Sequence, residues 1–265
     1  MAGTLLKRGV CVKNVLLLGD ITGRSRVALR MLVCVLEDKG HEVLMLPTTL
    51  VSNTLNLGGH EMLDTTDYLL RSLEMWKSLG ITYDLAYIGY ITGMEQAQKL
   101  AAAADALREK GVMVVLDPIL GDNGKRYNSI TDDQAQGMKL LCEHADLITP
   151  NLTEACLLLD RECGEKEAEE LALTLSDAGC SVLITSAAAK DCENAMIGYD
   201  KARQEGFVIP FERVPGHRWG TGDLFTGLLI DGLLRGKRIE TSAREAGEAV
   251  GRQLRGEEKS LLPEQ

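Results

Sequence analysis

The chain of 265 residues is 45% hydrophobic and 26% charged, which is ordinary for a globular protein and allows one domain or two. Its formal net charge of −10 argues against a nucleic-acid groove, because such a groove normally needs a basic surface. An anionic small molecule is not excluded, since glycine turns and helix N-termini can hold phosphates locally.

The first half of the chain alternates short apolar runs with amphipathic segments. The apolar runs, bounded by turn residues, predict strands at 15–18, 41–46, 84–88 and 112–116. Segments with apolar residues at helical spacing, each closed by a glycine, predict helices at 25–39, 63–79 and 96–110. Pro47 is expected to end the second strand, and a loop is expected over 48–59.

The same alternation continues through the second half of the chain. Helices are predicted at 132–143, 153–159, 165–178 and 241–254, with another directly after Asp223. Strands are predicted at 147–149 and 181–185, followed by an antiparallel hairpin of 195–199 and 207–209, and the polar tail 256–265 is expected to fray. Such alternation is typical of a mostly parallel sheet covered by helices on both faces, and the lack of a repeat or linker predicts one domain over 1–265.

Compartment is predicted from cysteine usage and from apolar run lengths. The seven cysteines form no C-x-x-C pair, so we expect mostly buried thiols in a reducing cytosol. No apolar run approaches the roughly 18–20 residues of a membrane span, and residues 1–14 lack the features of a signal peptide. We therefore expect a cytoplasmic protein with no membrane association.

Polar clusters follow six of the predicted strands. They are Gly19-Asp20, Thr48-Thr49, Gly89-Tyr90, Asp117-Pro118, Thr149-Pro150-Asn151 and Thr185-Ser186. In open α/β sheets, ligands bind outside the carboxyl ends of the strands. One such cluster is a turn, but six on the same edge predict a binding site.

The segment Gly220-Thr221-Gly222-Asp223 precedes an apolar helical run. Its glycines allow a tight turn and a close approach to a ligand, and the unpaired N–H groups of the following helix favour an anion. Asp223 has two interpretations here. It caps the helix, or it takes a proton from a hydroxyl that attacks a phosphoryl group.

Three further motifs leave alternatives open. Asp117 and Asp122, after a core strand, belong either to a polar turn or to a site. Asn151 and Glu154 stand three residues apart at a predicted helix start, either as a capping arrangement or as water-mediated ligands of Mg²⁺, which prefers oxygen ligands. Thr185-Ser186 is a hydroxyl pair for phosphate or an exposed strand end.

Taken together in this order, these residues resemble the ribokinase-like superfamily and, within it, the pyridoxal (vitamin B6) kinases. The matching pieces span about residues 19–236 and are Ser52-Asn53, Gly89-Tyr90, Asp117-Pro118, Gly121-Asp122, Tyr127, Thr149-Pro150-Asn151, Glu154, Thr185-Ser186 and Gly220-Thr221-Gly222-Asp223. The resemblance implies a three-layer αβα ribokinase-like fold and a homodimer. It also implies ATP-dependent phosphorylation of the 5′-hydroxymethyl group of pyridoxal, pyridoxine or pyridoxamine, in the salvage of pyridoxal 5′-phosphate.

The resemblance further implies roles for individual residues. Asp223 is the expected catalytic base, with the amides of Gly220, Thr221 and Gly222 as an anion hole. ATP is expected to bind with Mg²⁺ and a monovalent cation such as K⁺. The expected ATP-binding residues are Asp117, Asp122, Thr149, Asn151, Thr185 and Ser186, and the expected metal-binding residues are Asp117, Asn151 and Glu154. Phosphoryl transfer needs such positioning and charge neutralisation, and the absence of G-x-x-x-x-G-K-[S/T] excludes a P-loop enzyme.

The substrate side departs from the family's pattern. The family's serine-bearing loop after the first strand is here the segment 19–25, and its Ser-Asn-His is here Ser52-Asn53-Thr54. Asp20 attracts a substrate amine if it faces the pocket, which favours pyridoxamine, or else it caps a helix or faces water. A kinase for hydroxymethylpyrimidine or a sugar, or a non-catalytic vitamer- or nucleotide-binding protein, is the alternative function. The residues expected to bind the vitamer are Asp20, Thr48, Ser52, Tyr90 and Asp223.

Overall fold

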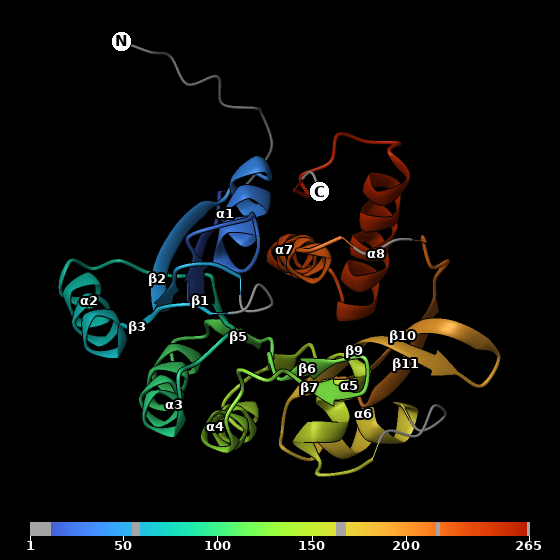
Figure 1. The fold of residues 1–265 in the computed structure, drawn as a ribbon, viewed down its shortest axis with the longest axis horizontal. Helices are drawn as coiled ribbons and strands as arrows, with labels where there is room; N and C mark the ends of the chain where they lie inside the picture. The colour runs from blue at the N-terminus through green and yellow to red at the C-terminus, as the bar shows by residue number, and fades with distance from the viewer. Residues whose placement is uncertain (1–11, 55–58, 163–167, 216–217, 264–265) are drawn as a thin grey trace.

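The computed structural model describes residues 12–54, 59–162, 168–215 and 218–263, and a nine-stranded sheet runs through its centre (Figure 1). The strands of this sheet are β1 Asn14–Thr22, β2 Glu42–Val51, β3 Met62–Asp64, β4 Leu85–Ile88, β5 Met113–Leu116, β8 Leu147–Ile148, β9 Ser181–Ala189, β10 Cys192–Asp200 and β11 Glu205–Pro210. Their order is β11-β10-β9-β8-β5-β4-β1-β2-β3. All pairings from β2 to β9 are parallel, and the outer pairings with β3, β10 and β11 are antiparallel.

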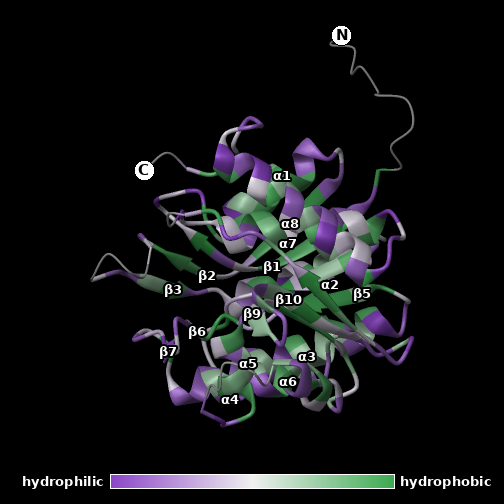
Figure 2. Ribbon diagram, turned by 90° about the vertical axis from the view of Figure 1, so that its right-hand side faces the viewer, coloured by the Kyte–Doolittle hydropathy of each residue, from purple (hydrophilic) through white to green (hydrophobic). Residues whose placement is uncertain are grey.

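Helices cover both faces of the sheet. One face packs against α1 Leu29–Asp38, α7 Thr221–Leu234 and α8 Ile239–Arg255. The other face packs against α2 Thr66–Ser78, α3 Met94–Arg108, α4 Asp132–Cys142, α5 Leu152–Leu158 and α6 Ala168–Ser176. Figure 2 shows hydrophobic strands between helices whose outer surfaces are polar. The predicted three-layer αβα architecture with a mostly parallel sheet is confirmed. Among the described helices, none is long and apolar enough to cross a bilayer.

Strand alternation divides the buried side chains between these two helical layers. On β5, Val115 packs in the core under α1 and α7, and its neighbour Leu116 packs in the core under α3 and α4. Because successive side chains of a strand point to opposite faces, the residue after Leu116 returns to the face under α1 and α7. Asp117 occupies that position. The end of the strand therefore aims a carboxylate at the layer that contains α7.

Two predicted boundaries are wrong for identifiable reasons. Pro47 does not end β2, which continues to Val51, because the register with β1 slips directly after Pro47 and accommodates a residue that lacks an N–H donor. The expected loop over 48–59 is therefore partly strand, paired with β3. Helix α1 begins at Leu29 rather than 25, since Ser25 and Ala28 have φ of 71° and 51°, outside the right-handed helical region.

A small second hairpin, β6 Gly121–Asp122 with β7 Lys125–Arg126, was not predicted. Its turn, Asn123-Gly124, has positive φ at both residues, as the tight two-residue hairpin turn requires. The Asn-Gly pair in the sequence was a signal for this hairpin, but strands of two residues are too short for the alternation of apolar residues to reveal them.

The first residues of the helix predicted over 165–178, up to residue 167, lie outside the described residues.

The C-terminal tail packs against the protein rather than fraying as expected. Leu262 is 5% exposed and belongs to the core under α1 and α7. The Leu261 N–H donates to the Gln253 side chain at 2.9 Å, and its carbonyl accepts from Arg26 at 3.0 Å. Apolar burial and these bonds fix the tail through Leu262, and residues 264–265 lie outside the described part.

Candidate active site

Four carboxylates from distant parts of the chain gather at the carboxyl ends of the central strands. Asp20 lies near the end of β1 and Asp117 directly follows β5, whereas Glu154 and Asp223 lie in the first turns of α5 and α7. We call these four residues the carboxylate cluster. None of the ion pairs among the described residues involves a member of the cluster. Their negative charge is therefore not balanced by a lysine or arginine of the described chain.

Burial is the largest cause of a raised pKa in every member of the carboxylate cluster. Burial, followed by the charge of Asp223, raises the pKa of both Asp20 and Asp117 to about 7. Burial, followed by the charge of Asp117, raises the pKa of Glu154 well above its ordinary value, and burial raises the pKa of Asp223. Like charges in a low-dielectric environment oppose one another's ionisation. A cation bound at the cluster would relieve this opposition.

Asp117 is held between a strand end and helix α7. Thr149, which follows β8, and Thr226, one turn after Asp223 on α7, hydrogen-bond to the Asp117 carboxylate and offset part of the rise in its pKa. Strand alternation explains the first contact, because Thr149 returns to the face under α7 after the oppositely directed Ile148. The predicted role of Asp117 and Thr149 toward ATP phosphates stays a prediction, but the two side chains do meet.

Asp223 does not cap helix α7. The helix begins after Gly220, whose φ of +81° gives the left-handed conformation of its N-cap position, and no side chain caps it. Asp223 is the third residue of the helix, and its Oδ2 accepts the Ala28 N–H at 2.9 Å. The capping interpretation is therefore wrong. The carboxylate is held from outside by the loop before α1, and no side chain of the described residues caps the first N–H groups of α7.

The capping interpretation holds instead for Asn151 and Glu154. Asn151 is the N-cap of α5, where its Oδ1 accepts the Glu154 N–H at 3.0 Å and Glu154 Oε2 accepts the Asn151 N–H at 2.9 Å. Glu154 Oε1 also accepts the Leu120 N–H at 3.1 Å, and Asn151 Nδ2 donates to the Gly121 carbonyl at 2.8 Å. Both residues thus join α5 to the segment before the β6–β7 hairpin. Their polar groups are engaged by the backbone, so the predicted metal role, which acts through water, stays a prediction.

The remaining residues of the expected nucleotide side lie on the β6–β7 hairpin and within β9, which continues to Ala189 and does not end at residue 185 as predicted. Asp122 is exposed on the β6–β7 hairpin, where its Oδ1 accepts the Asn123 N–H at 2.8 Å. Thr185 is half-buried in β9, with its N–H bonded to the Pro150 carbonyl, and Ser186 is exposed. These positions agree with an open nucleotide site. Their contact with ATP stays a prediction.

Two residues expected to bind the vitamer, Thr48 and Tyr90, are buried, whereas Ser52 is exposed. Thr48 is buried, and its hydroxyl donates to the Tyr90 carbonyl at 2.6 Å. Tyr90 is 3% exposed, and its hydroxyl accepts from Gln134 at 2.7 Å. Ser52 lies on the β2–β3 hairpin, where its hydroxyl donates to Asn53 and accepts the Glu61 N–H. The polar groups of these side chains connect loops, so their predicted contact with a vitamer stays a prediction.

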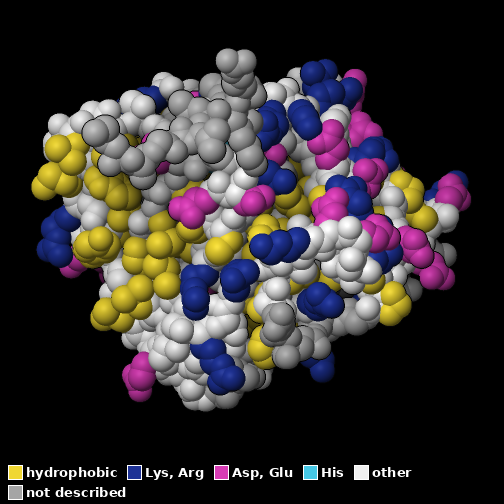
Figure 3. Space-filling view, turned by 90° about the horizontal axis from the view of Figure 1, so that it is seen from above, with side chains coloured by type: hydrophobic (Ala, Val, Ile, Leu, Met, Phe, Trp, Pro, Cys, Tyr) yellow, Lys and Arg dark blue, Asp and Glu magenta, His cyan; other side chains and the backbone are white. Residues whose placement is uncertain are grey.

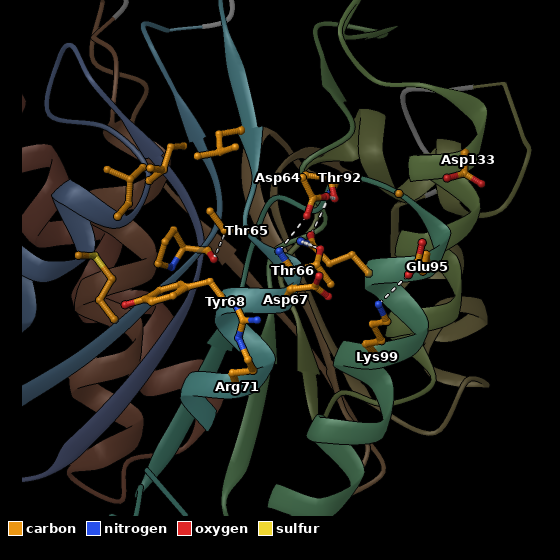
Figure 4. Close-up of a pocket in the computed structure, with 17 residues that line it drawn as sticks. Asp64, Thr65, Thr66, Asp67, Tyr68, Arg71, Thr92, Glu95, Lys99 and Asp133 are labelled. Atoms are coloured by element: carbon orange, nitrogen blue, oxygen red, sulfur yellow. Dashed lines mark hydrogen bonds and ion pairs between the residues drawn. The ribbon is translucent and has the colours of Figure 1, made fainter. Parts of the chain in front are cut away.

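A cleft of about 1030 Å³ lies beside this region, between α2 and α3 (Figure 4). Its acidic and basic groups largely engage one another or nearby polar groups. Lys99 pairs with Glu95 at 2.6 Å, and Asp64 accepts hydrogen bonds from Thr66 and Thr92. No member of the carboxylate cluster lines the cleft, although Ile21 and Pro47, the chain neighbours of Asp20 and Thr48, do.

Several residues of the site were not predicted. Thr226 follows Asp223 by three residues on a helix, and this spacing, which places two side chains on one face, could have identified it. Gln96 and Gln134 are buried amides that tie the loops around Thr48 and Tyr90 together, and only the fold places them there. Among the described residues, no group of three or more His, Cys, Asp or Glu is arranged to hold a metal. A bound Mg²⁺ would therefore rely on water and phosphate oxygens as well as protein.

Comparison with known proteins supplies the family. Residues 48–261 match the family model described as phosphomethylpyrimidine kinase. The pyridoxine/pyridoxal/pyridoxamine kinase of Bordetella avium is 30% identical, in an alignment that covers 74% of this chain and 69% of that protein. Alignments with two further curated relatives, from Schizosaccharomyces pombe and Saccharomyces cerevisiae, cover only 58% and 54% of the relatives' lengths.

Solved structures agree with this result over nearly the whole fold. A protein from Bacteroides thetaiotaomicron, named as a phosphomethylpyrimidine kinase and crystallised with pyridoxal, is 30% identical with a TM-score of 0.85, covering 93% of this chain and 88% of that one. The pyridoxal kinase of Lactobacillus plantarum is 25% identical with a TM-score of 0.81, covering 93% and 89%. This chain therefore belongs to the phosphomethylpyrimidine kinase family and has the ribokinase-like fold of pyridoxal kinases.

Proposed function

We propose that this protein is an ATP-dependent kinase that phosphorylates the 5′-hydroxymethyl group of a vitamin B6 vitamer. The observation that carries the proposal is the placement of Asp223. It stands in the first turn of α7, is not used as a cap, and lies close to Asp20 and Asp117. Relatives named as pyridoxal kinases support the substrate class. A protein that only binds a vitamer has no need of a carboxylate in the first turn of a helix that it does not cap.

In the proposed reaction Asp223 is the general base. The proton of the vitamer's hydroxymethyl group passes to Asp223 as the oxygen attacks the γ-phosphorus of ATP. The bond between that phosphorus and the bridging oxygen breaks, and ADP leaves. Burial raises the pKa of Asp223, which makes its carboxylate a stronger base, and the Ala28 N–H fixes its orientation.

The N-terminus of α7 is suited to the transferred phosphoryl group. The first turn, Gly220 to Asp223, presents N–H groups that no side chain in the described part of the chain caps. Such donors, with the helix dipole, stabilise the negative charge of a phosphoryl group in transit. Gly220 has φ +81°, and a Cβ there would lie 3.0 Å from the Arg26 carbonyl oxygen, so the turn requires glycine.

The carboxylate cluster fits a hydrated Mg²⁺ bound with ATP. Mg²⁺ prefers oxygen ligands and keeps several waters, and the cluster supplies buried carboxylates without a basic partner. When bound, the ion neutralises charge on the phosphates during transfer. In the proposed arrangement Asp117 faces the ion, with Glu154 and Asn151 acting through water. A monovalent cation such as K⁺ belongs to the same proposal, on the resemblance to the family.

Asp20 is the proposed determinant of vitamer preference. Its carboxylate lies near Asp223, and in the proposed arrangement a vitamer bound at Asp223 presents its substituents to Asp20. An amine there forms a charge-assisted hydrogen bond, which is stronger than a neutral one. Pyridoxamine is therefore the expected good substrate. Hydroxymethylpyrimidine is the second candidate acceptor, because the matching family model bears the phosphomethylpyrimidine kinase name.

Two copies of the chain are proposed to associate through the β3 edge of the sheet. Strand β3 pairs only with β2 among the described strands, and exposed apolar side chains lie on and beside it. They are Leu50, Met62, Leu63 and Tyr68. Figure 3 shows hydrophobic side chains gathered on this side of the molecule. Such a patch beside an open strand edge favours pairing with another chain. Cys34, Cys142, Cys180 and Cys192 are free thiols, in keeping with the cytoplasmic location that completes the proposal.

The test is an ATP-consumption assay with pyridoxal, pyridoxine, pyridoxamine and hydroxymethylpyrimidine, with products identified by mass spectrometry. Formation of a 5′-phosphate from a B6 vitamer is expected. Turnover with hydroxymethylpyrimidine alone would assign the second candidate. Binding of a vitamer without ATP consumption would assign a non-catalytic binding protein.

A further inference from the structure

Tyr87 lies in the middle of the sheet, directly beneath the candidate site. It is in β4, paired with Leu17 of β1 on one side and Val115 of β5 on the other. All three side chains pack in the core under α1 and α7. Asp117 lies on this same face, two residues after Val115. It is therefore at the level of Gly89, which is two residues after Tyr87. The Asp117 N–H donates to the carbonyl of Ile88, the residue before Gly89, at 2.9 Å.

The side chain of Tyr87 extends along the strand toward the carboxylate cluster. A Cβ at Gly89 would lie 2.7 Å from the Tyr87 hydroxyl oxygen and 3.1 Å from two ring carbons. The phenol therefore passes over Gly89, where only a glycine leaves room for it. Its hydroxyl reaches the sheet edge at the level of Asp117. Residue 89 is glycine, in this view, to admit a tyrosine from two residues earlier.

The surroundings keep the Tyr87 hydroxyl protonated. Burial, followed by the charges of the carboxylate cluster with Asp117 and Asp223 foremost, raises its pKa well above the ordinary value. Tyr87 is 3% exposed, and none of the hydrogen bonds among the described residues involves its hydroxyl. The hydroxyl is thus a neutral donor beside the carboxylate cluster.

We propose that Tyr87 is a further substrate-contacting residue, whose hydroxyl donates a hydrogen bond to the hydroxymethyl oxygen of the acceptor. The inference rests on the proposed kinase function. The acceptor oxygen has one proton and two lone pairs. With the proton directed to Asp223 and one lone pair held by Tyr87, the other lone pair is left to attack phosphorus. Orientation of this kind contributes to the rate of the chemical step.

The test is Tyr87→Phe, which keeps the ring in the core and removes only the hydroxyl. We expect kcat for pyridoxal to fall about tenfold or more, with little change in the KM for ATP. The thermal midpoint is expected to stay within about 2 °C of wild type. Tyr83→Phe is the matched control, because it makes the same chemical change just before the amino end of β4, away from the cluster. It should leave kcat unchanged.

Two outcomes overturn the inference. One is wild-type kcat in Tyr87→Phe, and the other is a loss of activity matched by a large loss of thermal stability, which assigns a packing role. Failure of the kinase proposal is seen separately, as wild-type protein that phosphorylates no vitamer. In that case the dissociation constant for pyridoxal tests whether Tyr87 contacts the vitamer. Weaker binding by Tyr87→Phe supports the contact, and unchanged binding overturns it.

Discussion

Replacing Asp20 with asparagine should stabilise the protein at pH 8 when no nucleotide or metal is bound. The side chain keeps its shape and loses its charge. Burial, followed by the charge of Asp223, raises the pKa of Asp20 from 3.8 to about 7. The ionised carboxylate therefore opposes folding above pH 7, and its removal takes that opposition away.

The magnitude follows from the pKa difference between the folded and unfolded states. One pKa unit corresponds to about 1.4 kcal/mol, so a rise of roughly three units corresponds to about 4 kcal/mol at pH 8. Asparagine remains a partly buried polar group, which offsets some of this gain. We expect a net stabilisation of about 2–4 kcal/mol. For a chain of this size that is roughly 4–8 °C in the thermal midpoint.

The pH dependence distinguishes this cause from better packing. Because the folded-state pKa of Asp20 lies above the unfolded value of 3.8, its destabilising effect is absent below pH 3.8 and grows until the pH passes about 7. Thermal unfolding of wild type and Asp20→Asn is measured at pH 8 and pH 5. The stabilisation by Asp20→Asn at pH 5 should be about a third of the stabilisation at pH 8. Asp177→Asn, an exposed change, is the control. An Asp20→Asn protein no more stable than wild type at pH 8, or equally stabilised at both pH values, would refute the reasoning.

Two other changes probe the same cluster. Glu154→Gln should raise the Mg²⁺ concentration for half-maximal rate more than it changes vitamer affinity, and an unmoved Mg²⁺ titration would transfer the metal role to Asp117 or Asp122. Asp20→Ser should lower the ratio of kcat/KM for pyridoxamine to that for pyridoxal, because a neutral hydroxyl binds an amine less strongly than a carboxylate does. An unchanged ratio would remove Asp20 from vitamer selection.

Positions that depend on strand alternation could be predicted from the sequence, and positions that depend on distant contacts could not. Asp117 and Thr149 follow apolar strands, so their presence at one sheet edge was predictable. The partner of Asp223 is Ala28, 195 residues away in the chain. Local pattern alone left Asp223 as a cap or a base, and the structure rules out the cap because α7 begins after Gly220, which makes Asp223 its third residue.

For Asn151 and Glu154 the structure shows the capping arrangement, and their metal role stays a prediction. Their spacing fits both a capping box and a metal site, and the structure forms the capping box with both of its reciprocal bonds. The predicted end of the strand at Pro47 was wrong for a related reason. Proline disfavours a regular ladder, but an irregular register with β1 accommodates it, and that irregularity depends on the neighbouring strand. Tyr87 was not identified as a site residue because a tyrosine within an apolar strand gives no sign of where its hydroxyl ends.

The central claim is that Asp223 is the base of a vitamer kinase. The most direct measurement is turnover of wild type and Asp223→Asn with saturating pyridoxal, ATP and Mg²⁺, together with ATP binding by each protein. The account predicts that Asp223→Asn binds ATP like wild type and loses about 10²-fold or more in kcat. Near wild-type turnover in Asp223→Asn would contradict it.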